Sequence, residues 1–312
     1  MCSQARKRVR ILFVYYFQLP TFVRKDLEIL KRYFEVKDLR VPTFRNPLNI
    51  LKLLLWTARV DLVYTWFAGT NAFFAVLFSM LLRKKSLVVI GGYDVAHVPE
   101  INYGSLLSPL ERVKVKFVLR HASMVLPVSR STALAMLRVA KPKRFEIVYN
   151  GVDVERFKPL GEKEDLVITV ASIITESTIK IKKLDVFVKT SAFLPQIKFI
   201  LVGKYDGSVQ HLKKIASSNV MFTGYLPSRV LLNYYRKAKV YCQLSTHESF
   251  GVALAEAMAC GCVPVVTRRY ALPEVVGDAG FYVPYNDPKA TAEAIKKALK
   301  SHKGIKARER IQ

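Results

Sequence analysis

Two glutamates, Glu248 and Glu256, lie on either side of a predicted helix start in the second half of the chain. The segment between them follows one apolar run (240–243) and precedes another (263–267), so we expect a helix over 251–260 that ends at Gly261. The N-terminus of such a helix presents free N–H groups and a partial positive charge. Because Gly251 has no side chain, an anion can approach the backbone there.

The two carboxylates and the helix start together suit one ligand. A diphosphate at the helix N-terminus, with carboxylates left to accept hydrogen bonds from ribose and sugar hydroxyls, is what a nucleotide-sugar requires. The alternative is structural: Glu248 would cap the helix and Glu256 would face solvent. Glu256 lies among Ala253, Leu254, Ala255, Ala257 and Met258, and a charge in so apolar a helix favours the functional interpretation.

These residues need a framework, and the hydrophobic pattern supplies one. Apolar runs rich in β-branched residues alternate with helical patterns, which is typical of parallel sheets built from βα units. The predicted strands are 9–17, 36–39, 62–64, 87–90, 124–128 and 146–149, then 166–172, 198–202, 220–223, 240–243, 263–267 and 280–283. We therefore expect an α/β protein with two Rossmann-like domains, 1–150 and 151–312, that face each other across a cleft.

The spacing of Glu248 and Glu256, followed by Ala-Met-Ala-Cys-Gly and Pro-Val-Val, resembles a known family: the retaining glycosyltransferases of the glycogen-synthase and sucrose-synthase-like group (group 1, family 4), which have the GT-B fold. Other segments agree with this resemblance: 90–94, 125–129, 148–159, 199–203, 221–225 and 272–277. The resemblance implies an enzyme that moves a sugar from a nucleotide-diphosphate donor to a hydroxyl acceptor, with retention and without a metal. It also implies that 1–150 binds the acceptor and 151–312 the donor.

Position by position, the resemblance implies that Glu256 holds the ribose hydroxyls of the donor and Glu248 its sugar hydroxyls. The other implied donor contacts are the segment Ser249, Phe250, Gly251 and Val252, with Gly203, Gly224 and Tyr225 lining the diphosphate and base pockets. An Arg of the family is replaced by Ser172. We expect Lys182 to be the family's catalytic Lys and Lys180 to supply the missing charge; the alternative for both is a solvated loop over 175–185.

On the acceptor side, relatives carry a His where this chain has Gly91, Gly92, Tyr93 and Asp94. The glycines let backbone approach a ligand closely, and Asp94 is a candidate acceptor contact or base. His97 is either a substitute for the missing His or a surface residue. In relatives a last helix crosses back to the first domain, and we expect this final helix to be absent here.

The formal net charge is +26, from 50 Lys and Arg against 24 Asp and Glu, and residues 1–150 hold 25 of those bases against 9 acids, a net of +16. Such a charge suits phosphorylated substrates or an anionic membrane. The leucine-rich run 48–56 is either a membrane contact or, as we prefer, a core helix. Nucleic-acid binding is not expected, because no basic and aromatic module is recognisable. A sugar-nucleotide epimerase, or a basic membrane or nucleic-acid binder, is the alternative function.

Four cysteines without a metal or redox spacing favour a reducing compartment, so we expect a cytoplasmic protein, peripheral at a membrane if anything. Cys260 and Cys262 lie in an apolar run and are expected to be buried thiols. Without Asp-x-Asp or a His and Cys cluster, no metal site is predicted. The nucleotide-sugar is a co-substrate, the acceptor is a carbohydrate or a lipid-linked sugar, and no cofactor is expected. The uncharged run 66–82 is predicted to be a buried helix and not a membrane span.

Overall fold

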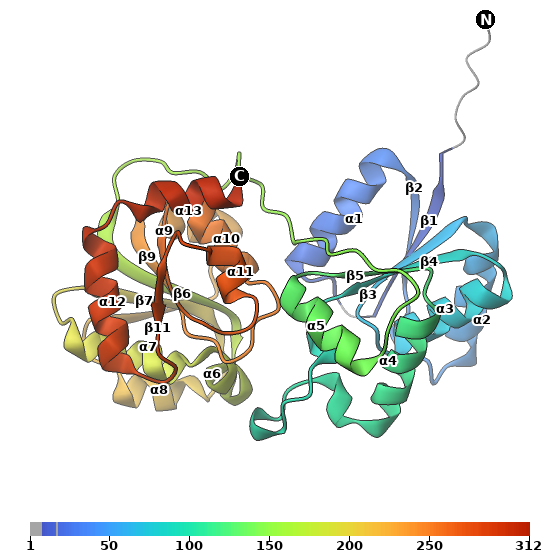
Figure 1. The fold of residues 1–312 in the computed structure, drawn as a ribbon, viewed down its shortest axis with the longest axis horizontal. Helices are drawn as coiled ribbons and strands as arrows, with labels where there is room; N and C mark the ends of the chain where they lie inside the picture. The colour runs from blue at the N-terminus through green and yellow to red at the C-terminus, as the bar shows by residue number, and fades with distance from the viewer. Residues whose placement is uncertain (1–7, 17) are drawn as a thin grey trace, which may run out of the picture. The chain divides into compact units, whose positions relative to one another are not determined.

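The computed structural model describes residues 8–16 and 18–312, which form two compact units that divide between Asn150 and Gly151. The last residue of the first predicted strand, Phe17, and the N-terminal Cys2 lie outside the described residues. Each unit is an α/β layer structure with a central parallel sheet covered by helices (Figure 1). The α/β class and the two parallel-sheet domains are therefore confirmed.

The first unit contains a five-stranded parallel sheet in the order β2-β1-β3-β4-β5. Its strands are β1 (Arg10–Tyr15), β2 (Glu35–Arg40), β3 (Leu62–Trp66), β4 (Lys85–Ile90) and β5 (Met124–Pro127). Its helices are α1 (Thr21–Tyr33), α2 (Pro47–Arg59), α3 (Thr70–Leu81), α4 (Pro109–His121) and α5 (Arg130–Val139), with short 3-10 turns at Tyr93–Val95, Pro99–Ile101 and Ser105–Leu107.

The chain direction separates the helices of this unit onto two faces. The connection through α1 runs from β1 to β2, opposite in direction to the connections through α2, α3 and α4. Because parallel crossovers are right-handed, α2, α3 and α4 cover one face of the sheet and α1 covers the other. Ring contacts connect the segments on the face covered by α2, α3 and α4. Phe74 of α3 stacks on Phe44, which precedes α2, at 4.6 Å between centroids, and Phe73 of α3 lies 4.9 Å from Phe117 of α4.

The second unit contains a six-stranded parallel sheet in the order β11-β10-β9-β6-β7-β8. Its strands are β6 (Glu164–Ile174), β7 (Lys198–Tyr205), β8 (Val220–Gly224), β9 (Ala238–Gln243), β10 (Val263–Thr267) and β11 (Phe281–Val283). Its helices are α6 (Glu176–Lys182), α7 (Leu184–Thr190), α8 (Val209–Ile215), α9 (Ser228–Lys237), α10 (Val252–Ala259), α11 (Leu272–Val276), α12 (Pro288–Lys300) and α13 (Lys303–Ile311), with a 3-10 turn at Ser191–Phe193.

One expected strand needs correction, and two helices were not predicted. The predicted strand 146–149 is wrong: Glu146 and Val148 donate backbone N–H groups to β5, but no continuous strand forms. The segment 175–185, for which a solvated loop was the alternative, contains the unpredicted helix α6, whose start is capped by the Thr175 side chain on the N–H of Thr178. The segment after 301 also forms a helix that the sequence did not predict, α13, which packs on α10 within the second unit. The absence of a helix that crosses back to the first unit stays a prediction.

The remaining sequence expectations about burial hold. Cys242, Cys260 and Cys262 are buried free thiols, and burial raises the pKa of Cys260 to about 12. The run 66–82 contains α3, which packs on the sheet with half of its residues buried. Within the described ranges 8–16 and 18–312, every helix is too short or too polar to cross a membrane.

Candidate functional site

The strand order of the second unit fixes where a ligand can bind. The chain runs from β6 through β7 to β8 on one side, then returns to the other side of β6 with β9, β10 and β11. The order therefore reverses between β6 and β9, and ligands of open α/β sheets bind beyond the carboxyl ends of the strands at such a switch point. The segments that leave these two strands are α6 after β6 and the loop 244–251 after β9.

A basic and an acidic predicted residue meet at this point. The Lys182 ammonium, at the end of α6, lies 3.2 Å from a carboxylate oxygen of Glu248 in the loop after β9. The Gln243 side-chain amide, at the end of β9, donates to the same oxygen. Both charged side chains are largely buried, with 24% of Lys182 and 18% of Glu248 exposed. The switch point thus holds a partly desolvated cation and carboxylate beside an amide.

Backbone tethers hold these two loops together. Thr246 donates both its N–H (2.7 Å) and its hydroxyl (3.0 Å) to the carbonyl of Ile181, the residue before Lys182. The hydroxyl of Thr267, at the end of β10, donates to the carbonyl of Ser245 at 2.9 Å. The N–H of Ala271 donates to the carbonyl of Glu248. The position of the Lys182 and Glu248 pair is therefore set by hydrogen bonds to main-chain carbonyls, which join α6, the loop after β9 and the end of β10.

The predicted helix start lies next to this pair. The helix α10 begins at Val252, and Gly251 precedes it as its N-cap with φ 95°, a conformation that favours glycine. The helix begins one residue later than the sequence predicts. No side chain caps α10, so its first N–H groups keep the partial positive charge that suits an anion. Phe250 is buried, and Ser249 and Val252 are half-buried.

Tyr241 of β9 is a buried polar residue near the carboxyl end of its strand. The tyrosine is fully buried, and its hydroxyl has no hydrogen-bond partner among the described residues. Burial raises the pKa of Tyr241, and the negative charges of Glu248 and Glu256 add to this effect. Glu248 comes from the loop after β9 and Glu256 from the second turn of α10. Glu256 is half-buried.

Other predicted donor residues lie apart from this cluster. Lys180 is exposed and pairs with Glu176 at 2.6 Å, four residues earlier on α6, so it is not brought to Glu248. Gly203 is buried in β7, where a Cβ would overlap the carbonyl oxygen of Ala171. This contact gives Gly203 a packing role between β6 and β7. Gly224 ends β8 with φ 72°, and Tyr225 after it is 70% exposed. Ser172, at the position expected for an Arg, is exposed on β6.

The predicted acceptor residues follow β4 in the first unit. Asp94 is buried, and its carboxylate accepts the N–H groups of Ala68 (2.9 Å) and Gly92 (2.8 Å). Burial raises the pKa of Asp94 to about 6, against the opposing effect of these amides. The carboxylate therefore ties the loop after β3 to the loop after β4, and its role as an acceptor base stays a prediction.

The neighbours of Asp94 differ in exposure. A Cβ at Gly91 would overlap the ring of Phe67, and Gly92 has φ 104°, so both positions need glycine. Tyr93 is half exposed and its ring lies 5.2 Å from that of Tyr103. His97 is exposed.

Sequence reasoning missed several polar residues at the carboxyl ends of the strands. Gln243 and Tyr241 were assigned only as parts of an apolar strand. His247 is buried, its ring lies 4.0 Å from that of Tyr270, and burial lowers its pKa. In the first unit, Asp26 of α1 accepts hydrogen bonds from the Tyr64 hydroxyl and from the Trp66 indole. The helix α1 also carries Glu28, which is exposed, so nothing in the sequence singled out Asp26.

Potential metal ligands do not cluster in the part of the chain that the structure describes. Those residues contain no group of three or more His, Cys, Asp and Glu side chains that could hold a metal ion. Metal independence of the chemistry stays a prediction.

Known proteins resemble this chain in sequence. The family model for "Glycosyl transferases group 1" matches residues 153–312, half of the chain. The chain is 38% identical over 80 residues to the O-antigen chain mannosyltransferase B of Escherichia coli (26% of this chain, 21% of that protein). It is 29% identical over 179 residues to the D-inositol 3-phosphate glycosyltransferase of Mycolicibacterium gilvum (52% of this chain, 40% of that protein). The matches thus span a fifth to two fifths of these relatives' own lengths.

Solved structures resemble the whole chain. The HepE protein of Anabaena, solved with UDP and glucose, has a TM-score of 0.76 at 18% identity and covers 97% of this chain and 94% of its own. The sucrose-phosphate synthase of Thermosynechococcus elongatus has a TM-score of 0.78 at 17% identity, covering 98% and 94%. At these identities the likeness shows the fold, which is the GT-B fold.

Proposed function

Because this chain belongs to the group 1 glycosyl transferases, we propose that it transfers a sugar from a nucleotide-diphosphate donor to a hydroxyl of a carbohydrate or lipid-linked acceptor. The transfer keeps the anomeric configuration and needs no metal. The observation that carries the proposal is the Lys182 and Glu248 pair at the switch point of the second unit, beside the uncapped start of α10. UDP and glucose in the structure of the similar HepE protein support a nucleotide-sugar as donor.

Each part of this site has a task in the reaction. As the bond between the sugar and the diphosphate breaks, negative charge develops on the leaving phosphate. The Lys182 ammonium and the N–H groups at the start of α10 stabilise that charge, which is largest in the transition state. Because both are held by the tethers to Ile181 and Ser245, little reorganisation is needed when the charge appears.

The carboxylates bind hydroxyl groups. Glu256 accepts hydrogen bonds from the ribose, and Glu248 accepts them from the donor sugar while Gln243 and Lys182 hold its orientation. In the first unit, the loops that Asp94 joins position the acceptor. The protein works in the cytoplasm, in peripheral contact with an anionic membrane.

A transfer assay with a panel of UDP-, GDP- and ADP-sugars, with EDTA present, tests the reaction. We expect one donor to stabilise the protein against heat, as any ligand specific for the folded state does, and to be consumed when an acceptor is supplied. Glu256→Ala should abolish this stabilisation, whereas Glu274→Ala, on the neighbouring α11, should keep it. Product formed from the donor alone would instead identify an epimerase, and normal donor binding by Glu256→Ala would remove Glu256 from the site.

A further inference from the structure

The outer face of α2 in the first unit carries an unusual row of leucines. Leu48, Leu51 and Leu55 recur at helical spacing and are 68%, 49% and 47% exposed. The helix has a second, inner side, where Leu53 and Thr57 are buried. The prediction of a core helix over 48–56 is therefore correct for one side of α2 only. That side packs in the core, and the other side presents aliphatic side chains to solvent.

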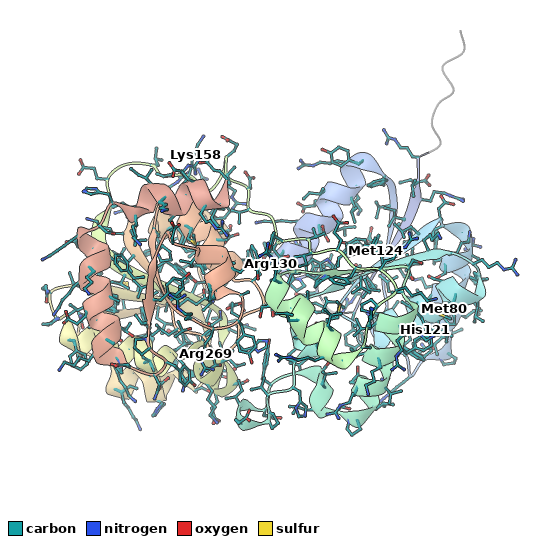
Figure 2. All side chains as sticks on the ribbon, in the orientation of Figure 1. Met80, His121, Met124, Arg130, Lys158 and Arg269 are labelled. Carbon is teal, nitrogen blue, oxygen red and sulfur yellow. The ribbon has the colours of Figure 1, made fainter. Side chains whose placement is uncertain are left out.

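The neighbouring helices α3 and α4, on the same face of the sheet, also carry exposed aliphatic side chains. Met80 and Leu81 end α3, and Leu81 is 68% exposed. Leu110 and Val113, one turn apart on α4, are about two thirds exposed. Met80 is labelled at the margin of the unit in Figure 2, on the side where Figure 1 shows α2 and α3. We call these seven side chains the aliphatic face.

Basic residues surround the aliphatic face almost without acidic ones. The segments 43–60, 70–85 and 109–121, which contain α2, α3 and α4, hold ten Lys and Arg and one carboxylate, that of Glu111. The single carboxylate pairs with Lys114 at 2.7 Å. On α2, Lys52 follows Leu48 by four residues and Arg59 follows Leu55 by four, so both basic side chains lie on the same exposed side as the leucines. On α4, Lys116 and Arg120 do the same beside Val113.

We propose that this face docks on an anionic lipid surface, with the aliphatic side chains entering the boundary between headgroups and acyl chains. Aliphatic residues on helices that lie in the interface bind through buried apolar area, and the surrounding cations bind the negative leaflet. A second copy of the chain does not suit the face, because two surfaces of the same positive charge repel. Nucleic acid would neutralise the charge but leave the leucines exposed to water.

The proposal deepens the membrane contact of the proposed function by naming its surface, and its test needs no donor or acceptor. The full chain is sedimented with two kinds of vesicle, at low and at high salt. One kind is phosphatidylcholine alone, and the other contains about a third phosphatidylglycerol. We expect binding to the anionic vesicles that weakens as salt increases. The triple variant Leu48→Ser, Leu51→Ser, Leu55→Ser should lose at least about tenfold in partitioning.

Two further variants separate docking from general stickiness. Ile29→Ser removes an exposed aliphatic side chain from α1, on the other face of the sheet, and should bind vesicles as the unchanged protein does. The variant Lys52→Gln, Lys116→Gln, Arg120→Gln should lose binding to anionic vesicles while its thermal unfolding stays unchanged. The proposal is overturned if the unchanged chain does not bind anionic vesicles, or if the leucine variant binds them as well as the unchanged chain. It is also overturned if the aliphatic face binds an acidic polypeptide or RNA and not vesicles.

Discussion

Replacing Lys182 by Met tests the switch-point cluster most directly, and Lys180 offers a matched control. The two lysines lie on the same short helix, two residues apart, but Lys182 is 24% exposed and contacts Glu248 whereas Lys180 is 55% exposed and contacts Glu176. Methionine keeps much of the aliphatic volume of lysine and removes the charge. A difference between the two variants therefore reports on position and not on helix propensity or net charge.

The structure sets the size of the expected effects. An exposed pair such as Lys180 and Glu176 contributes about 0 to 1 kcal/mol to stability. Because Lys180 contacts Glu176 and not Glu248, Lys180→Met should change nucleotide affinity little, by less than about fivefold. Lys182 is placed to donate a charge-assisted hydrogen bond to a bound diphosphate, which contributes about 1.5 to 3 kcal/mol. Its loss should weaken binding by roughly 10- to 150-fold. Without a ligand, loss of the largely buried pair with Glu248 should reduce the free energy of unfolding by about 1 to 2 kcal/mol.

The assay is titration calorimetry with UDP, GDP and ADP on the unchanged chain and on both variants, together with urea unfolding of each. If Lys182→Met binds the preferred nucleotide as tightly as the unchanged chain, or if Lys180→Met loses as much affinity, the assignment of Lys182 to the diphosphate is refuted.

Two other predictions concern packing and pH. Gly203→Ala should reduce the free energy of unfolding by about 1 to 3 kcal/mol in urea, because the added Cβ meets the carbonyl oxygen of Ala171. The control Gly207→Ala, whose Cβ meets no atom within 4 Å, should change this free energy little. Asp94 has a pKa of about 6 when folded and about 4 when unfolded. Its stabilising contribution is therefore complete below pH 4 and is lost as the pH rises through 6. The advantage of the unchanged chain over Asp94→Asn should fall by roughly 2 to 3 kcal/mol from pH 4 to pH 7, and a difference independent of pH would contradict the buried ionisation.

The sequence predicted those features that depend on a repeated apolar pattern. In strands such as Lys198–Tyr205 and helices such as Pro288–Lys300, the spacing of apolar residues predicts which side chains are buried. The helix α6 was missed because its seven residues offer one buried side chain, Ile179, and its first turn is stabilised by a local Thr175 cap that hydrophobic periodicity does not register. The segment 146–149 has strand composition but bonds only intermittently with β5.

The candidate site was predicted in part, for a related reason. The acidic pair and Gly251 stand out in the sequence because their types contrast with an apolar helix. The contact of Lys182 with Glu248 joins residues 66 positions apart, and it depends on the order of strands in the sheet. Gln243 was missed because an amide at the last position of a buried strand is indistinguishable, in sequence, from a strand end that faces solvent.

The tether between Thr246 and Ile181 has a consequence for how this site can vary among related sequences. Thr246 uses its N–H and its hydroxyl, but the partner at 181 contributes only a main-chain carbonyl. Substitution at position 181 therefore leaves the acceptor in place, while position 246 must keep a small hydroxyl residue to make both bonds. The geometry of the Lys182 and Glu248 pair thus constrains the side chain at position 246 but not the side chain at position 181, which can vary among related sequences.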